Sequence, residues 1–156
     1  MNFIADLHVH YKYSIAKAKN LDLEHLYMAA QIKGITVVGT GDFTHPAWFN
    51  EIETKLQPAE NGLYVLDPDL AAHCDAQVPP SCRRPVRFIL ESEISNIYKK
   101  KQKTRKNHNL IFMPNRRAAK KFNARLDRIG NIKADGRPIL GLDARNLLEI
   151  MLEVSD

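Results

Sequence analysis

Two histidines near the start of the chain have the residue type and spacing of metal ligands. His8 and His10 lie two apart within residues 3–10, where apolar and polar side chains alternate. Alternation of this kind predicts a β-strand, and residues two apart on a strand project from the same face. Two imidazole nitrogens placed in this way can reach one metal ion at ~2.0–2.1 Å, or two adjacent ions. An edge strand with a solvated polar face explains the same residues equally well.

Further ligand-type side chains recur where other strands are expected to begin or end. They are Asp42 after residues 34–41, Glu91 and Glu93 on one face of residues 86–93, and His108 at the start of residues 107–113. Ligands in α/β sheets collect at the carboxyl ends of strands, so we expect these side chains to converge with the first two histidines. Taken singly, each has another explanation: Asp42 as a turn former, Glu93 as an exposed acid, and His108 as an ordinary core or surface histidine.

The elements that must position these residues alternate between strand and helix. Besides the strands above, an extended stretch over residues 94–98 leads into a basic turn at 99–103. Helices are expected over residues 21–33, 46 to about 56, 116–129 and after Asp143, with Gly34 ending the first and Asn115 capping the third. This alternation predicts an α/β fold with a mainly parallel sheet and a β-hairpin insert. Residues 67–85 are polar and contain consecutive prolines, which predicts an exposed insertion loop.

Charge is divided unevenly along the chain. Residues 1–93 hold 8 Lys or Arg against 12 Asp or Glu, whereas residues 94–156 hold 15 against 6, so a net charge of −4 is followed by one of +9. The basic part predicts a surface for a polyanion, although a run of lysines is also typical of a solvated face. The candidate nucleic-acid contacts are Lys99, Lys100, Lys101, Lys103, Arg105, Lys106, Arg116, Arg117, Lys120 and Lys121.

Composition excludes several other classes of protein. With 44% hydrophobic and 26% charged residues, the chain is typical of a globular domain rather than a disordered or fibrous one. No apolar run approaches the ~20 residues of a membrane-spanning helix. Polar residues also interrupt the N-terminus where a signal peptide needs an apolar core. We therefore expect a cytoplasmic protein with no membrane partner.

Five motifs resemble a known family. The segment DLHVHYKYS (residues 6–14) is similar to the opening motif of the PHP (polymerase and histidinol phosphatase) superfamily of metal-dependent phosphoesterases. Four others resemble the endonuclease Q branch, whose members often carry helicase-like names: GTGDFTHPAW (39–48), FILESEISNIY (88–98), RKNHNLIFMP (105–114) and DGRPILGLDARNLLEI (135–150). The resemblance covers nearly the whole chain apart from about residues 67–84.

The resemblance implies a distorted (β/α)7 barrel, a cluster of two or three divalent metal ions, and cleavage of DNA beside deaminated bases such as uracil or hypoxanthine, as in DNA repair. Carried over by position, the metal ligands are His8, His10, Glu93 and His108. Asp42 and His45 are further candidate ligands, and Asp42 and Glu93 are the expected catalytic carboxylates. Carboxylate and imidazole ligands together suit zinc or manganese, and magnesium is less well served by histidine.

The chain also departs from the family pattern. Phe43 and Thr44 separate Asp42 from His45, where the histidine usually follows the acid directly, and Ala16 stands where many relatives have another histidine. The family's late histidine and D-x-H motifs have no counterpart here, and a closed barrel typically needs ~200 residues or more. We therefore expect residues 1–156 to be the N-terminal part of a single PHP domain. Its incomplete barrel predicts weak or no nuclease activity alone and self-association through an open edge.

Two alternatives remain open from the sequence. One is a non-catalytic nucleic-acid-binding module in which the basic residues matter and the histidines do not. The other is a small-molecule phosphatase of the histidinol phosphate kind. The extended basic tract favours a polymeric anion over a small monoester, which needs only a compact anion pocket.

Overall fold

The computed structural model describes residues 2–14 and 20–155. Ala16, which stands where many relatives have a histidine, lies outside these ranges. Within them the helices are α1 (Leu23–Lys33), α2 (Pro46–Lys55), α3 (Pro68–Asp75), α4 (Arg116–Leu126) and α5 (Ala144–Ser155), with a 3-10 turn η1 (Pro80–Cys82). The strands are β1 (Ala5–Asp6), β2 (Val37–Gly39), β3 (Leu56–Pro58), β4 (Leu63–Leu66), β5 (Arg87–Lys100), β6 (Lys103–Met113) and β7 (Ile139–Leu140).

Strand β5 is the centre of a seven-stranded sheet in this part of the chain. The first half of β5 lies between β2 and β4, and the second half lies between β7 and β6. Strands β1, β2, β5 and β7 run parallel, whereas β3, β4 and β6 are paired antiparallel. The expected mainly parallel sheet is therefore wrong in detail: the sheet is mixed, because β3 and β4 add an antiparallel hairpin to one side of β5.

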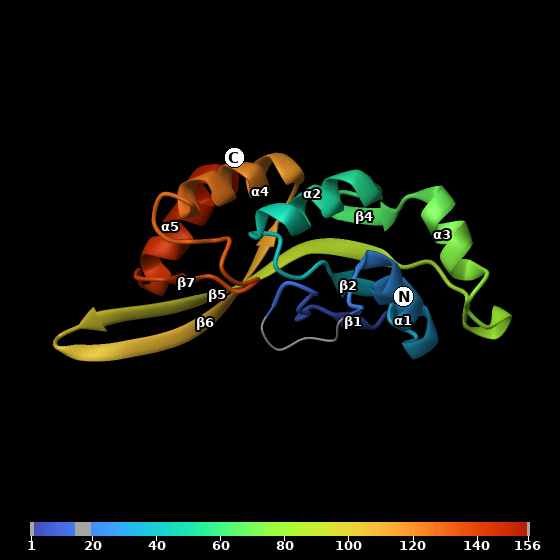
Figure 1. Cartoon of the computed structure of the whole chain (residues 1–156), viewed down its shortest axis with the longest axis horizontal. Helices are drawn as coiled ribbons and strands as arrows, with labels where there is room; N and C mark the ends of the chain where they lie inside the picture. The colour runs from blue at the N-terminus through green and yellow to red at the C-terminus, as the bar shows by residue number, and fades with distance from the viewer. Residues whose placement is uncertain (1, 15–19, 156) are drawn as a thin grey trace.

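The second half of β5 and β6 form a long hairpin that extends away from the rest of the molecule (Figure 1). Its ladder runs from the pair Leu90–Met113 to the pair Lys100–Lys103. Lys101 and Gln102 make the turn with φ values of 50° and 62°. Two residues with positive φ match the right-handed twist of the strands they join. This confirms the expected hairpin, and we call its outer residues 97–106 the basic arm.

The helices begin and end where local sequence signals place them. Asp22, Asn115 and Asp143 each accept a hydrogen bond from the backbone N–H three residues further on, at 2.9, 2.9 and 3.0 Å. Each side chain therefore satisfies one of the free N–H groups at the start of its helix. Gly34 ends α1 in the left-handed conformation, with φ 74°.

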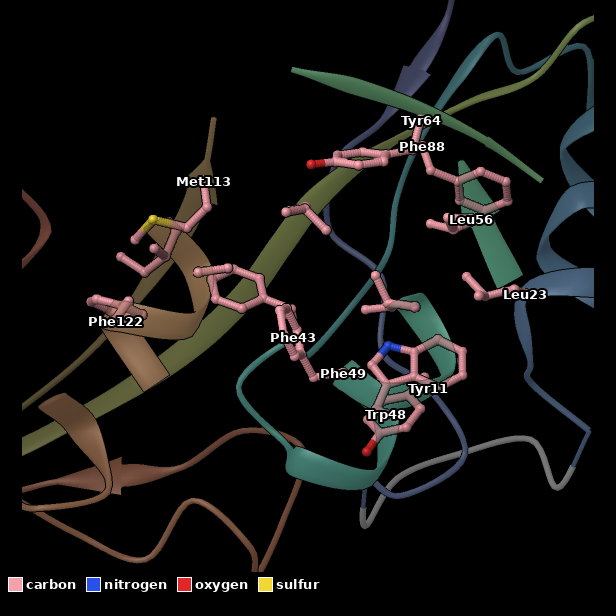
Figure 2. Close-up of a cluster of buried hydrophobic side chains, with 14 of the residues drawn as sticks. Tyr11, Leu23, Phe43, Trp48, Phe49, Leu56, Tyr64, Phe88, Met113 and Phe122 are labelled. Carbon is pink, nitrogen blue, oxygen red and sulfur yellow. The ribbon is translucent and has the colours of Figure 1, made fainter. Parts of the chain in front are cut away.

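The hydrophobic core fixes the segment that follows β2. Trp48 of α2 is fully buried and stacks on Tyr11, with ring centroids 4.2 Å apart (Figure 2). The indole Nε1 donates to the carbonyl oxygens of Thr40 at 3.0 Å and Gly41 at 2.8 Å. Because a buried indole N–H needs an acceptor, these bonds hold the chain after β2 against α2.

Two expectations about the fold need correction. Residues 67–85 are not simply a loop, because α3 and η1 lie there and α3 packs against α1 through the buried Cys74. Strand β1 covers two residues rather than residues 3–10, so His8 and His10 follow its end. The sheet of the described residues is open, with β1 and β3 at the ends of its strand order, which agrees with the expected incomplete barrel. In the same ranges, no helix has the length and apolar character to cross a membrane.

Candidate metal centre

His8, His10 and Glu93 form a compact group in the structure. Each offers one ligand atom, and these three atoms lie within 4.8 Å of one another. His8 Nε2 lies 3.3 Å, and His10 Nε2 3.1 Å, from the same oxygen of Glu93, Oε2. Glu93 is 4% exposed, whereas the side chain of His8 is 52% exposed, so the group opens to solvent on one side.

The backbone after β1 brings the two histidines to β5. Strand β1 runs parallel to β2, and β2 runs parallel to β5, so the chain leaves β1 at the carboxyl end of the sheet. There Val9 lies against Gly41, whose φ is 68°, and a Cβ atom on residue 41 would stand 2.7 Å from the Val9 carbonyl oxygen. Only glycine accommodates both the positive φ and this close approach. The approach sets His8 and His10 over Glu93.

His108 reaches Glu93 from the neighbouring strand. In the antiparallel ladder, Leu110 is opposite Glu93 and His108 is opposite Ser95, so His108 is a diagonal neighbour of Glu93 on the same face. His108 Nδ1 lies 2.6 Å from Glu93 Oε1, the oxygen that the other two histidines do not approach. Glu93 is therefore shared by three imidazoles, one on Oε1 and two on Oε2.

Asp42 lies on the other side of His10. Its Oδ2 accepts a hydrogen bond from Ser14 Oγ at 2.5 Å and is 3.4 Å from His10 Nδ1. Asp42 is fully buried, and its Oδ1 has no hydrogen-bond partner among the described residues. Burial raises the pKa of Asp42 above its usual value, and the contacts with Ser14 and His10 only partly oppose this effect. His10 is thus held between two carboxylates, Asp42 at Nδ1 and Glu93 at Nε2.

The two glutamates of β5 have opposite electrostatic character. Burial, with a further contribution from the charge of Asp42, raises the pKa of Glu91 to about 8. Burial also acts to raise the pKa of Glu93, but the hydrogen bond with His8 and the charges of Arg137, His108 and His10 outweigh it and lower that pKa. Glu93 is therefore favoured as an ionised carboxylate, whereas Glu91 is a buried acid close to its neutral form.

The donor set passes a chemical test for a divalent cation. Imidazole nitrogens and a carboxylate oxygen converge, which is a common ligand combination for transition metals in proteins. Three buried atoms nearby, His10 Nδ1, Asp42 Oδ1 and Glu91 Oε1, have no hydrogen-bond partner among the described residues. Buried polar atoms normally have partners, so such orphans require an explanation, and a cation close to both acids supplies one. The residues therefore fit a metal ion.

Other predicted residues are not part of this group. His45 stacks on Tyr13, with ring centroids 4.8 Å apart and planes 11° apart, and burial lowers its pKa. It is outside the ligand group formed by the described residues. Arg116 is occupied as well: its guanidinium donates to the carbonyl oxygens of Ile52, Glu53 and Leu56. Arg116 therefore stabilises the junction of α4 with α2, which corrects its assignment as a nucleic-acid contact.

The remaining basic residues fall into two sets. The lysines and arginine of the basic arm are exposed, and Lys100 Nζ lies 3.4 Å from Asp143. Arg117, Lys120 and Lys121 are exposed on α4, where Lys120 pairs with Glu53 at 2.7 Å. Helix α4 and the segment after β1 lie on opposite sides of β5 (Figure 1). The α4 residues are therefore separated from the candidate metal centre by the sheet, whereas the arm is continuous with it.

Sequence reasoning missed two contributors to the site. Ser14 completes the hydrogen bonding of Asp42. Arg137 Nη1 lies 3.5 Å from Glu93 Oε2. Both lie in segments that resemble endonuclease Q, DLHVHYKYS and DGRPILGLDARNLLEI, but no spacing rule distinguishes a serine or an arginine there from a surface residue.

Comparison with known proteins relates this arrangement to an endonuclease fold. The chain superposes on the lesion-specific endonuclease PfuEndoQ of Pyrococcus furiosus with a TM-score of 0.75 and 25% identity, over 97% of this chain and 32% of that one. A complex of endonuclease Q with a 27-mer duplex substrate, which has an abasic lesion at the active site, gives a TM-score of 0.74 with 25% identity, over 97% and 33%. The expected resemblance to endonuclease Q is therefore matched in structure.

A similar sequence occurs in the uncharacterized protein MJ0043 of Methanocaldococcus jannaschii, with 25% identity over 96% of this chain and 15% of that protein. No protein-family model matches the chain. The chain thus spans about a third of the endonuclease Q chains and a smaller share of the Methanocaldococcus protein.

Proposed function

We propose that this chain carries a divalent-metal site of a metal-dependent phosphodiesterase that cleaves DNA. The observation that supports the proposal most directly is the convergence of His8, His10 and Glu93 within 4.8 Å. His108, on the second oxygen of Glu93, is the further residue that would hold metal there, as the family resemblance implies. Zinc and manganese suit imidazole and carboxylate together, with magnesium as the weaker alternative.

A bound metal ion of this type supplies an activated water at neutral pH and neutralises charge that develops on a phosphoryl group. The protein's own contribution is to orient the ligands. Asp42 Oδ2 lies 3.4 Å from His10 Nδ1 and Glu93 Oε2 lies 3.1 Å from His10 Nε2, so the two carboxylates flank the ring and restrict its orientation. We propose Asp42 and Glu93 as the catalytic carboxylates. Glu93 contacts His8 through Oε2 and His108 through Oε1.

The basic arm is the proposed DNA-binding surface next to the centre. Side chains alternate along β5, so Lys99 shares a face with Glu93, and Lys106 lies on the same face of β6 as His108. Lys100 is on the opposite face, where it meets Asp143. Lysines neutralise phosphates in a way that depends on salt rather than on sequence. We propose that Lys99 and Lys106 contact the DNA that enters the centre.

The proposed substrate is DNA that contains a deaminated base such as uracil or hypoxanthine. Two observations support a lesion substrate: the motifs similar to endonuclease Q, and the likeness in fold to a protein described as a lesion-specific endonuclease. Because this chain spans about a third of that one, we propose that the 156-residue chain alone has weak or no cleavage activity. Robust metal-dependent cleavage of a uracil-containing duplex by the purified chain would contradict this part of the proposal.

Metal analysis of the purified chain tests the main proposal. The protein is loaded with zinc or manganese and then dialysed against metal-free buffer. The unsubstituted protein should retain metal in stoichiometric amount, measured by inductively coupled plasma mass spectrometry. His8→Ala and His10→Ala should each weaken retention at least about tenfold, because each removes a ligand. His73→Ala is the matched control, since His73 is exposed at the end of α3. Equal metal retention in all four proteins would reject the site.

The second candidate is a nucleic-acid-binding module without catalysis, and the exposed basic arm is the observation that favours it. In that case DNA binding would depend strongly on salt and would be unaffected by His8→Ala and His10→Ala. Binding of a labelled duplex at two salt concentrations, measured by fluorescence anisotropy on the same variants, separates the two candidates.

A further inference from the structure

Arg137 brings a guanidinium to the edge of the candidate metal centre. Its Nη1 lies 3.5 Å from Glu93 Oε2, the oxygen shared by His8 and His10. The Arg137 side chain is 39% exposed, whereas Glu93 is 4% exposed, so the guanidinium covers the carboxylate on one side and faces solvent on the other. It therefore lies between the buried Glu93 carboxylate and solvent.

The backbone on both sides of Arg137 is fixed to the site. Gly136 packs against Ser14 and Asp42 so closely that a Cβ atom on residue 136 would stand 2.5 Å from Asp42 Oδ2. The carbonyl oxygen of Pro138 accepts a hydrogen bond from Ser95 N at 3.0 Å, and β7 then continues in parallel along β5. Arg137 is thus held between two anchored neighbours, and it is not a side chain on a loose loop.

A metal ion at this centre would share the negative charge of Glu93 with Arg137. Arg137 and a metal ion held by His8 and His10 are both cationic, and both would use Glu93 Oε2. With the carboxylate engaged by the ion, N–H donors of the guanidinium on its solvent-facing side are available to an anionic acceptor. A guanidinium matches the geometry of a phosphate group and can donate two parallel hydrogen bonds to it.

We infer that Arg137 binds the non-bridging oxygens of the phosphodiester that is cleaved at this centre. The inference rests on the proposed function, because it requires a metal ion at His8, His10 and Glu93. It adds a residue that touches the substrate, from a loop that supplies none of those three ligands. Arg137 and the metal ligands then approach the phosphate from different elements, β5 with its neighbours on one side and the loop before β7 on the other.

The test uses inorganic phosphate as the probe and the zinc-loaded 156-residue chain as the protein. Isothermal titration calorimetry should show that Arg137→Gln weakens phosphate binding at least about tenfold, while zinc content stays equal to that of the unsubstituted chain. Arg137→Lys should show an intermediate loss, because a lysine keeps the charge but cannot donate in bidentate fashion. Arg145→Gln is the charge-matched control, since Arg145 is 85% exposed on α5 and pairs with Glu149.

Each result bears on the inference. Unchanged phosphate affinity in a zinc-loaded Arg137→Gln protein overturns it while leaving the proposed function intact. Loss of zinc from both Arg137→Gln and the milder Arg137→Lys also overturns it, because Arg137 would then support the ligands instead of the substrate. If the unsubstituted chain retains no zinc or manganese, the proposed function fails and this inference fails with it.

Discussion

Gly136 lies directly against the buried carboxylate of Asp42, although the two residues come from different loops. A Cβ atom on residue 136 would stand 2.5 Å from Asp42 Oδ2 and would also collide with Ser14 Oγ. The loop before β7 and the segment after β2 are therefore packed together at the candidate metal centre, and residue 136 has no room for a side chain.

Gly136→Ala should destabilise the protein by about 1–3 kcal/mol, the usual cost of forcing extra atoms into a packed site. Gly141→Ala is the matched control, because a Cβ atom there meets nothing within 4 Å. Denaturant unfolding followed by circular dichroism measures both free energies. Equal stability of the two variants would show that the contact between Gly136 and Asp42 is absent in solution.

Opposite faces of the basic arm should differ in their effect on DNA binding. The double variant Lys99→Ala/Lys106→Ala removes two charges from the face that carries Glu93, and Lys100→Ala/Lys103→Ala removes two from the other face. We expect the first pair to weaken binding of a labelled duplex about tenfold at low salt and the second pair to have a smaller effect. Anisotropy titrations at matched ionic strength measure this, and equal losses would mean that both faces contact DNA.

The cap of α1 should make stability depend on pH in the acidic range. Partial burial acts to raise the pKa of Asp22, but hydrogen bonds from the backbone and ring of His25 outweigh it, so the folded pKa is below the usual value. A lowered carboxyl pKa contributes stability that is present above the unfolded pKa and is lost as pH falls through the folded pKa.

Asp22→Ala should therefore lower the free energy of unfolding by about 1 kcal/mol at neutral pH, with a smaller loss below the folded pKa of Asp22. Asp22→Asn is the informative control, because asparagine caps a helix about as well but does not titrate. It should keep most of the neutral-pH stability and remove this acid dependence. Thermal unfolding between pH 3 and pH 7 compares the three proteins, and identical pH profiles would contradict the assignment.

Arg116 and its neighbour Arg117 should behave differently although both are arginines at the start of α4. Arg116 donates to three carbonyl oxygens near the end of α2, and its guanidinium lies 4.9 Å from the Tyr64 ring centroid. Arg116→Ala should cost about 1–3 kcal/mol, because it removes the hydrogen bonds that the half-buried guanidinium donates to these carbonyl oxygens. Arg117 is exposed, so Arg117→Ala should change stability by less than about 0.5 kcal/mol. Chemical denaturation distinguishes the two, and a similar loss in both would refute the structural role of Arg116.

Local signals in the sequence predict the starts of α2, α4 and α5 and the long hairpin, whereas α1 begins two residues later than expected and α3 is missed. Asp22, Asn115 and Asp143 act through hydrogen bonds three residues away, so their roles are written within a few neighbouring positions. The approach of His8 and His10 to Glu93 was also foreseeable, because strands that run parallel bring their carboxyl ends to one edge. Even so, β1 ends before His8, and the expected alternation along residues 3–10 was not what positioned the histidines.

The remaining features depend on partners that are distant in the sequence. The sequence places Arg116 on the basic face of a helix and so predicts a DNA contact, because its acceptors, around Leu56, lie 60 residues away and leave no local signal. Strands β3 and β4 have three and four residues, too short to show a period, and they exist because the edge of β5 is there to pair with. Gly136 reaches Asp42, and Arg137 reaches Glu93, because β7 pairs with β5.

The 14 residues of β5 run without interruption from the middle of the sheet to the tip of the arm. Glu91 and Glu93 therefore lie on the same strand as Lys99 and Lys100. No loop or break in the strand separates these carboxylates from the tip of the arm. The proposed DNA contact Lys99 and the proposed catalytic carboxylate Glu93 therefore belong to one β-strand, so the pairing that orders the arm also orders the backbone of Glu93.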